Sequence, residues 1–176
     1  DYPPLKTGFN PPGTRRFGYI GHAGRMKNTP YLGEIARQLP GTEFAWIGPG
    51  VQTLPGVSAL GRLDFSSESV REVLASFDFL ITVGRADANP TTVLEAMAWG
   101  LIPVCTPQSG YVGLPGVINV PLDNAEGAAA ILRGLQATPD ADLRRLQRTN
   151  WEALGDHYTW DRFASQVDER IDSNET

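Results

Sequence analysis

Short apolar runs alternate along most of the chain with stretches that carry apolar side chains at helical spacing. Several of the apolar runs end at Gly or Pro, which favours buried strands followed by loops. The expected strands are residues 16–20, 42–47, 57–60, 77–83, 101–105 and 116–120, and the expected helices are residues 29–39, 66–74, 90–99, 125–135, 140–154 and 160–171. Strands that alternate with helices predict an α/β fold with a doubly wound, Rossmann-like parallel sheet covered on both faces.

The run 77–83 is the most apolar and is the expected central strand. A strong helix start follows it. Asn89 is a good N-cap, and Pro90 suits the first helical position because it has no N–H group to leave unpaired. Gly100 is expected to end this helix, and Pro103 prevents its return. The helix at 66–74 begins with serine and has an acid near enough for a capping box.

Polar side chains in the helix 90–99 fall on one face, at Thr91, Thr92 and Glu95. Two interpretations of Glu95 compete. It can belong to the solvated face of an ordinary amphipathic helix. Alternatively, the helix is largely buried, and the carboxylate needs hydrogen-bond donors such as the paired hydroxyls of a sugar. Spacing alone does not choose between them.

Composition limits the classes of protein. The chain has 176 residues, 41% of them hydrophobic, which is enough for one core and most simply one domain. A net charge of −5 argues against a general nucleic-acid binder. The one cysteine, Cys105, lies in an apolar run, so a disulfide framework is excluded and a cytoplasmic setting is expected. No apolar run approaches the roughly 20 residues that span a bilayer.

Residues 1–15 are rich in Pro and Gly, which is typical of a linker or an extended lead-in. The chain also begins at Asp1 rather than Met. We therefore expect one folded domain over residues 16–176, cut from a longer protein at a hinge.

A basic loop follows the first expected strand. His22, Arg25 and Lys27 lie within a few residues of Gly21 and Gly24. The loop lacks both the Gly-x-Gly-x-x-Gly fingerprint and the Gly-Lys-Ser/Thr ending of a P-loop, so neither a dinucleotide nor a Walker-type site is supported. Glycines permit close backbone approach and cations supply charge, which suits a diphosphate. The alternative is a solvated basic turn.

Ligands of doubly wound sheets bind beyond the carboxyl ends of the strands. The basic loop around Lys27 and the acidic stretch from Asp87 to Glu95 both lie at such ends. Cations on one loop and carboxylates on the other describe a ligand with an anionic part and a hydroxyl-bearing part. A nucleotide sugar has both.

These residues also carry a family resemblance. The segment Leu80–Val104 contains Asp87 and Glu95 with seven residues between them, followed by Ala-Met-Ala-Trp-Gly-Leu-Ile-Pro-Val. It resembles the donor-site signature of GT-B glycosyltransferases of the large retaining family 4, usually Glu-x7-Glu followed by Ala-Met-Ala-x-Gly-x-Pro-Val. Residues 19–28, 60–62 and 158–160 resemble further motifs of that family, so the resemblance covers residues from about 16 to 171.

The resemblance implies the C-terminal, donor-binding half of an enzyme that moves a sugar from a nucleotide-diphosphate donor to an acceptor. It implies that Lys27 neutralises the leaving diphosphate, Glu95 holds the ribose and Asp87 holds the sugar. The implied catalytic residues are His22, Arg25 and Lys27, and the implied donor-binding residues are Gly21, Arg62, Leu63, Asp87, Asn89, Pro90, Thr91, Thr92 and Glu95, with Arg62 and Leu63 at the base. No metal and no cofactor are implied.

Three positions depart from the family pattern. Asp87 stands where Glu is usual and is one methylene shorter. His22 replaces an arginine, so a permanent bidentate cation gives way to a group that is mostly neutral near pH 7, for which Arg25 is a candidate substitute. Ala88 replaces the usual Gly. These departures bear on rate and donor choice more than on fold.

The resemblance also implies that an N-terminal acceptor domain is missing from this chain. The fragment alone is therefore expected to bind nucleotide sugar and to transfer sugar poorly or not at all. Any membrane contact of the full-length protein would be made through the missing domain. Two alternatives stay open, a non-catalytic nucleotide-sugar binding module and a sugar epimerase built on the same two-domain plan.

Overall fold

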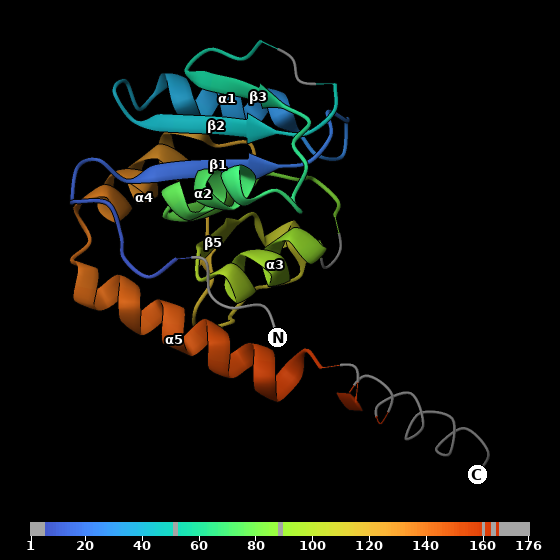
Figure 1. Cartoon of the computed structure of the whole chain (residues 1–176). Coiled ribbons are helices and arrows are strands. Elements are labelled where there is room, and N and C mark those ends of the chain that lie inside the picture. The colour runs from blue at the N-terminus through green and yellow to red at the C-terminus, as the bar shows by residue number, and fades with distance from the viewer. Residues whose placement is uncertain (1–5, 51–52, 88–89, 160, 163–164, 166–176) are drawn as a thin grey trace.

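The computed structural model describes residues 6–50, 53–87, 90–159, 161–162 and 165. Within these residues, six parallel strands form one sheet in the order β3-β2-β1-β4-β5-β6 (Figure 1). The strands are β1 (Arg16–Ile20), β2 (Glu43–Ile47), β3 (Val57–Gly61), β4 (Phe79–Thr82), β5 (Ile102–Cys105) and β6 (Ile118–Asn119). The helices are α1 (Thr29–Arg37), α2 (Glu68–Ser76), α3 (Thr91–Trp99), α4 (Ala125–Ala137) and α5 (Asp140–His157), with the 3₁₀ turn η1 (Pro107–Ser109). The predicted doubly wound α/β fold is confirmed.

Helices cover both faces of the sheet. Figure 1 shows α2 and α3 on the viewer's side, α1 and α4 behind, and α5 along the lower border. On the face that α1 and α4 cover, the ring of Phe17 stacks on those of Phe44 and Phe79, its partners in the neighbouring strands, at 5.1 and 4.8 Å between centroids. These aromatic pairs stabilise the register of β1 with its two neighbours, β2 and β4.

The helix after β4 begins one residue later than predicted. Pro90 occupies the cap with ψ of 125°, which is extended, so the helix starts at Thr91. The proline ring fixes φ alone, and the loop sets ψ. Asn89, the predicted N-cap, lies outside the described residues. Gly100 ends the helix in a left-handed conformation with φ of 82°, as predicted.

Two other helix predictions need comment. The helix predicted at 66–74 is present as α2, but the expected capping box is not, because Ser67 makes no side-chain cap bond and its hydroxyl lies 2.7 Å from that of Ser69. The helix predicted over residues 160–171 lies almost wholly outside the described residues. No described helix is long and apolar enough to cross a membrane.

Residues 6–15 of the predicted lead-in form no helix or strand, but they are fastened to the domain. Asp78, fully buried just before β4, accepts hydrogen bonds from the backbone N–H and the side chain of Asn10 at 2.8 and 2.7 Å and from the N–H of Arg16 at 2.9 Å. The Nζ of Lys6 lies 3.0 Å from the same carboxylate. Residues 6–15, which we call the strap, therefore lie against the amino-terminal ends of β1 and β4. The loops that carry the predicted site lie at the opposite ends of the strands.

Candidate functional site

The carboxyl ends of β1 and β2 meet at a close approach of the backbone around Gly21 and Gly48. The N–H of Gly21 donates to the carbonyl oxygen of Ile47 at 3.0 Å, and the indole N–H of Trp46 donates to that of Gly21 at 2.7 Å. A Cβ atom on Gly48 would lie 2.0 Å from the Gly21 oxygen. Glycine at position 48 is therefore required for the two loops to approach, and this contact fixes where the basic loop begins.

Lys27, in the loop after β1, and Asp87, in the loop after β4, form an ion pair beyond the carboxyl ends of these strands. Both side chains are about three-quarters buried, with 27% and 25% exposed. The same two loops are joined by a backbone bond of 2.8 Å from Arg85 N–H to the carbonyl oxygen of Met26. The structure thus brings together the cation predicted for the diphosphate and the carboxylate predicted for the sugar, and each balances the charge of the other.

The other two predicted cations of the basic loop do not join this pair. The side chains of His22 and Arg25 are exposed and make no hydrogen bond or ion pair within the described part of the chain. The backbone oxygen of His22 accepts a long bond, 3.4 Å, from the Tyr19 hydroxyl. Arg25 instead lines a neighbouring pocket.

Two buried tyrosines that the sequence analysis did not select lie near Asp87. Burial, and then the negative charge of Asp87, raise the pKa of Tyr19. Burial likewise raises the pKa of Tyr111, whose hydroxyl donates to the carbonyl oxygen of Pro90 at 3.3 Å. Both phenols therefore stay protonated near neutral pH. Tyr19 lies in an apolar strand. Only its position shortly before the basic loop could have indicated from the sequence that it lies near the site.

Glu95 lies on the exposed face of α3, with Thr91 also exposed and Thr92 half-buried. Val93, Ala96 and Met97 form the buried face. Glu95 is thus on the solvated face, as the amphipathic interpretation expects, while seven of the nine helix residues are buried or half-buried. Its role as a ligand of sugar hydroxyls stays a prediction. Protein atoms around the carboxyl group still remove part of its water, and this desolvation raises the pKa of Glu95 above its ordinary value.

The loop after β3 lies against the carboxy-terminal end of α3. Leu63 packs with Ile20 and Trp99 on the core of this face, while Arg62 is exposed. The ring of Phe65, 39% exposed, stacks on that of Trp99 with 6.1 Å between centroids. The residues predicted for the base are thus placed near the helix that carries Glu95. Phe65 is an addition that its position after the Arg62–Leu63 motif could have suggested.

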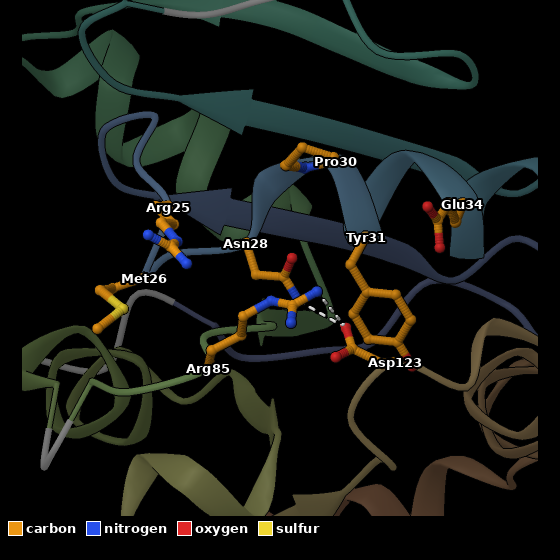
Figure 2. Close-up of a pocket in the computed structure, with 8 residues that line it drawn as sticks. All are labelled: Arg25, Met26, Asn28, Pro30, Tyr31, Glu34, Arg85 and Asp123. Atoms are coloured by element: carbon orange, nitrogen blue, oxygen red, sulfur yellow. Dashed lines mark hydrogen bonds and ion pairs between the residues drawn. The ribbon is translucent and has the colours of Figure 1, made fainter.

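A pocket of about 700 Å³ opens beside the Lys27–Asp87 pair, between the loops after β1, β4 and β6 and the first turns of α1 (Figure 2). Arg85, exposed on the loop after β4, donates from its Nη2 to Asp123 at 2.8 Å. The side-chain amide of the buried Asn28 donates to the same Asp123 oxygen at 3.2 Å. Asn28, Arg85 and Asp123 were not among the site residues predicted from the sequence. Arg85 follows the expected strand 77–83 after one glycine, so the rule that ligands bind beyond the carboxyl ends of strands could have found it.

No three His, Cys, Asp or Glu side chains in the described ranges gather closely enough to hold a metal ion. The chemistry that these residues offer is recognition by charge and hydrogen bonding. Lys27 can bind an anion, and Asp87 and Glu95 can accept hydrogen bonds from hydroxyls.

Solved structures with a similar arrangement include glycosyltransferases and a sucrose-phosphate synthase. The C-terminal domain of a glycosyl transferase group 1 family protein (LpcC) from Francisella tularensis matches with a TM-score of 0.67 at 16% identity, over 85% of this chain and 89% of that chain. Sucrose-phosphate synthase from Thermosynechococcus elongatus matches with a TM-score of 0.74 at 16% identity, over 93% and 46%. A mutant of S. aureus TarM, in complex with Fondaparinux, alpha-GlcNAc-glycerol and UDP, matches with a TM-score of 0.72 at 12% identity, over 96% and 37%.

No protein-family model and no curated protein matches the sequence. Identities this low establish the fold alone. The chain has the fold of the C-terminal domain of a GT-B, group 1 glycosyltransferase, as the resemblance implied. It spans less than half the length of the sucrose-phosphate synthase and TarM chains.

Proposed function

We propose that this chain is the donor-binding domain of a retaining glycosyltransferase of the family 4 type, which uses a nucleotide-diphosphate sugar. The observation that carries the proposal is the meeting of Lys27 and Asp87 at the carboxyl edge of the sheet, shortly before α3 begins. Doubly wound sheets bind their ligands at this edge. A cation and a carboxylate in contact match a donor in which a diphosphate is joined directly to a sugar.

In this proposal the donor exchanges partners within the ion pair. A diphosphate oxygen takes the place of Asp87 beside Lys27, and Asp87 then accepts hydrogen bonds from sugar hydroxyls. When the bond between the anomeric carbon and the diphosphate breaks, negative charge grows on the leaving group. A fixed ammonium next to that group stabilises the charge, which is the electrostatic contribution that transfer requires.

The nucleoside would lie along α3. Glu95 is exposed and free of hydrogen bonds within the described residues, so its carboxylate can accept both ribose hydroxyls. The stacked pair of Phe65 and Trp99 offers an apolar surface near Leu63 for the base.

A non-catalytic nucleotide-sugar binding module is the second candidate. It is favoured by one observation: His22, at the arginine position of the family, makes no hydrogen bond or ion pair with Lys27 or Asp87 in the described structure. A binding module would hold the donor without breaking it. Release of nucleoside diphosphate from UDP-glucose by a protein that contains this domain, measured with and without an acceptor, separates the two candidates.

Calorimetric titration of the 176-residue chain with UDP-, GDP- and ADP-glucose tests the proposal. We expect one nucleotide sugar to bind, and Lys27→Ala and Glu95→Ala each to weaken it by at least about tenfold, because each removes a charge-assisted contact. Arg37→Ala, at the far end of α1, and Glu152→Ala, exposed on α5, are matched controls that should leave affinity unchanged. Unchanged affinity in both site variants would refute the site.

Asp87→Asn distinguishes the partner exchange from a purely structural ion pair. The variant leaves Lys27 without its carboxylate, so we expect UDP alone to bind several-fold more tightly. UDP-glucose also loses the contact between its sugar and Asp87, so its affinity should increase less than that of UDP. A structural pair would show the opposite result, with both ligands weakened together by a disordered loop. The ratio of the two affinities is therefore the measurement that decides.

A further inference from the structure

Asp123 lies in the loop between β6 and α4, and its carboxylate joins three loops. Its Oδ1 accepts a hydrogen bond from the side-chain amide of Asn28 at 3.2 Å and another from Nη2 of Arg85 at 2.8 Å. Figure 2 shows these two side chains beside Asp123. Asn28 comes from the loop after β1 and Arg85 from the loop after β4, 95 and 38 residues away along the chain. One carboxylate therefore connects loops that are far apart in sequence.

Each of these two donors is close in sequence to one member of the Lys27–Asp87 pair. Asn28 directly follows Lys27, and Arg85 precedes Asp87 by two residues. The N–H of Arg85 also donates to the carbonyl oxygen of Met26 at 2.8 Å, so the two loops meet on both sides of the ion pair. A shift of Asn28 or Arg85 would therefore shift the ammonium or the carboxylate of the pair.

The backbone of Asn28 needs support from its surroundings. Asn28 is 6% exposed and precedes α1 with φ of 53°, in the left-handed region. Such a conformation is uncommon for a residue other than glycine and persists where neighbouring contacts enforce it. The bond from its side chain to Asp123 is one of these contacts, and the bond from its N–H to the oxygen of Gly24, at 3.1 Å, is another. Asp123 thus stabilises the backbone at the residue next to Lys27.

The backbone around Asp123 is itself held on both sides. The hydroxyl of the buried Tyr31, in α1, donates to the carbonyl oxygen of Pro121 at 2.6 Å and accepts from the N–H of Asn124 at 3.1 Å. The side chain of Asn124 caps α4 by accepting from the N–H of Gly127 at 2.9 Å. Asp123 has φ of 54° between these anchors. Its carboxylate is therefore presented from a fixed backbone.

The ion pair between Arg85 and Asp123 is not of the kind that stabilises a fold. Its side chains are 49% and 43% exposed, and water screens the attraction between charges that are half exposed. Loss of the pair should therefore leave the domain folded. What distinguishes the pair is its place, one side chain away from the groups predicted to bind the donor.

We propose that Asp123 is a positioning residue for the nucleotide-sugar site: through Asn28 and Arg85, its carboxylate holds the loops of Lys27 and Asp87 in the arrangement that the donor meets. The proposal rests on the proposed function, because only a donor bound by this pair gives the arrangement a consequence. Asp123 acts through its two partners and does not touch the donor. Hydrogen bonds to a diphosphate depend on distance and direction, so displaced loops bind it less well.

Asp123→Asn and Asp123→Gly separate position from charge. Both variants remove the negative charge and both tolerate a positive φ, but only asparagine keeps an oxygen that accepts from Asn28 and Arg85. Calorimetric titration of the 176-residue chain with UDP-, GDP- and ADP-glucose compares them. We expect the nucleotide sugar that binds the unaltered chain to bind at least about threefold more weakly to the glycine variant than to the asparagine variant.

Asp142 provides the matched control. It is also 43% exposed, and it pairs with Arg145 at 3.0 Å in the first turns of α5. Asp142→Asn and Asp142→Gly should bind the nucleotide sugar equally. Asn28→Gly is the second test of the same contact, because it removes one donor without a change of net charge and keeps the positive φ available. It should weaken binding at least about threefold relative to the unaltered chain, whether or not Asp123→Gly folds.

The Lys27→Ala background shows whether the effect passes through Lys27. With UDP, GDP and ADP as ligands, which lack the sugar proposed for Asp87, the difference between Asp123→Gly and Asp123→Asn should disappear in this background. The ammonium that the loop positions is then absent, so the two substitutions are coupled. A purely structural role of Asp123 would give the same difference with and without Lys27.

Three results would overturn the positioning role and leave the proposed function standing. They are equal affinities of Asp123→Gly and Asp123→Asn, unchanged affinity in Asn28→Gly, and a difference that persists in Lys27→Ala. Binding of none of the three nucleotide sugars by the unaltered chain would overturn the proposed function and the positioning role together. Titration of the unaltered chain therefore comes first and tells the two failures apart.

Discussion

Glu95 is the residue whose protonation should control nucleoside binding. Its partial desolvation raises the pKa of Glu95 above the ordinary 4.5, so the folded chain takes up a proton at a higher pH than an exposed glutamate does. The protonated form is favoured by folding, and the corresponding stabilisation is present at low pH and is lost as pH rises through the folded pKa. The affinity for the ligand changes with pH in the opposite direction, because the ribose hydroxyls need the ionised carboxylate as their acceptor.

We therefore expect affinity for UDP-glucose to fall as pH is lowered from 7, and to begin falling above pH 4.5. Glu95→Gln should remove this part of the dependence. The comparison is made in the His22→Gln background, which removes the imidazole of the basic loop from both proteins. A pH profile of affinity that Glu95→Gln leaves unchanged would contradict the ribose assignment.

Single residues show where prediction from sequence stopped. Lys27 and Asp87 could be selected because each follows a strand of a predicted parallel sheet. Their direct contact could not, because they are 60 residues apart and spacing along a chain does not give a distance between loops. The same holds for Arg85 and Asp123, which are 38 residues apart.

Helix α4 contains a glycine that the fold does not need. Gly134 is exposed within the helix, and a methyl group placed on it would meet no atom within 4 Å. Alanine loses less conformational freedom on folding, so Gly134→Ala should raise the free energy of unfolding by about 0.5–1 kcal/mol. Urea denaturation measures the change.

Gly116→Ala is the contrasting variant. A Cβ atom there would lie 1.8 Å from the Oδ1 of the buried Asn150, whose amide donates to the Gly116 carbonyl oxygen at 3.0 Å. We expect a loss of about 1–3 kcal/mol, the usual cost of overpacking. Equal effects of the two variants would show that contact at position 116 does not matter.

At the level of elements, the alternation of strands and helices was sufficient to predict the sheet and its two covered faces. The predicted first residues of helices were less accurate where the backbone dihedral angles of a single residue determine the start of the helix. Pro90 has a helical φ but an extended ψ, and Ser67 has an extended cap conformation without the expected side-chain bond. These details depend on loop geometry that residue preferences do not contain.

At the scale of the whole molecule, the strap joins parts of the chain that are far apart in sequence, because Lys6 and Asn10 both contact Asp78. Burial lowers the pKa of Lys6, although the neighbouring Asp78 acts in the opposite direction. Asp78→Ala would leave this buried ammonium and the Asn10 donors without their acceptor. We expect a loss of about 3–5 kcal/mol in the free energy of unfolding, as for other buried pairs that lose one partner.

Thermal and urea unfolding of Asp78→Ala measure this loss, with Asp156→Ala, exposed on α5, as the control expected to stay within about 0.5 kcal/mol. Asp78→Asn keeps one acceptor oxygen and should lie between the two. A loss in Asp78→Ala no larger than in the control would show that the strap is dispensable. Pro and Gly composition predicts a segment without regular structure, but it carries no information about the buried polar contacts of Lys6 and Asn10.

The Lys27–Asp87 pair also determines how a ligand would arrive. The chain carries a net charge of −5, and the cation nearest the proposed diphosphate position is already balanced by a carboxylate. The net negative charge opposes long-range attraction of an anion, so we expect the encounter to gain little from electrostatic steering. Attraction begins only when the diphosphate reaches Lys27 and displaces Asp87. Selectivity would then reside in the lifetime of the complex rather than in the frequency of collisions.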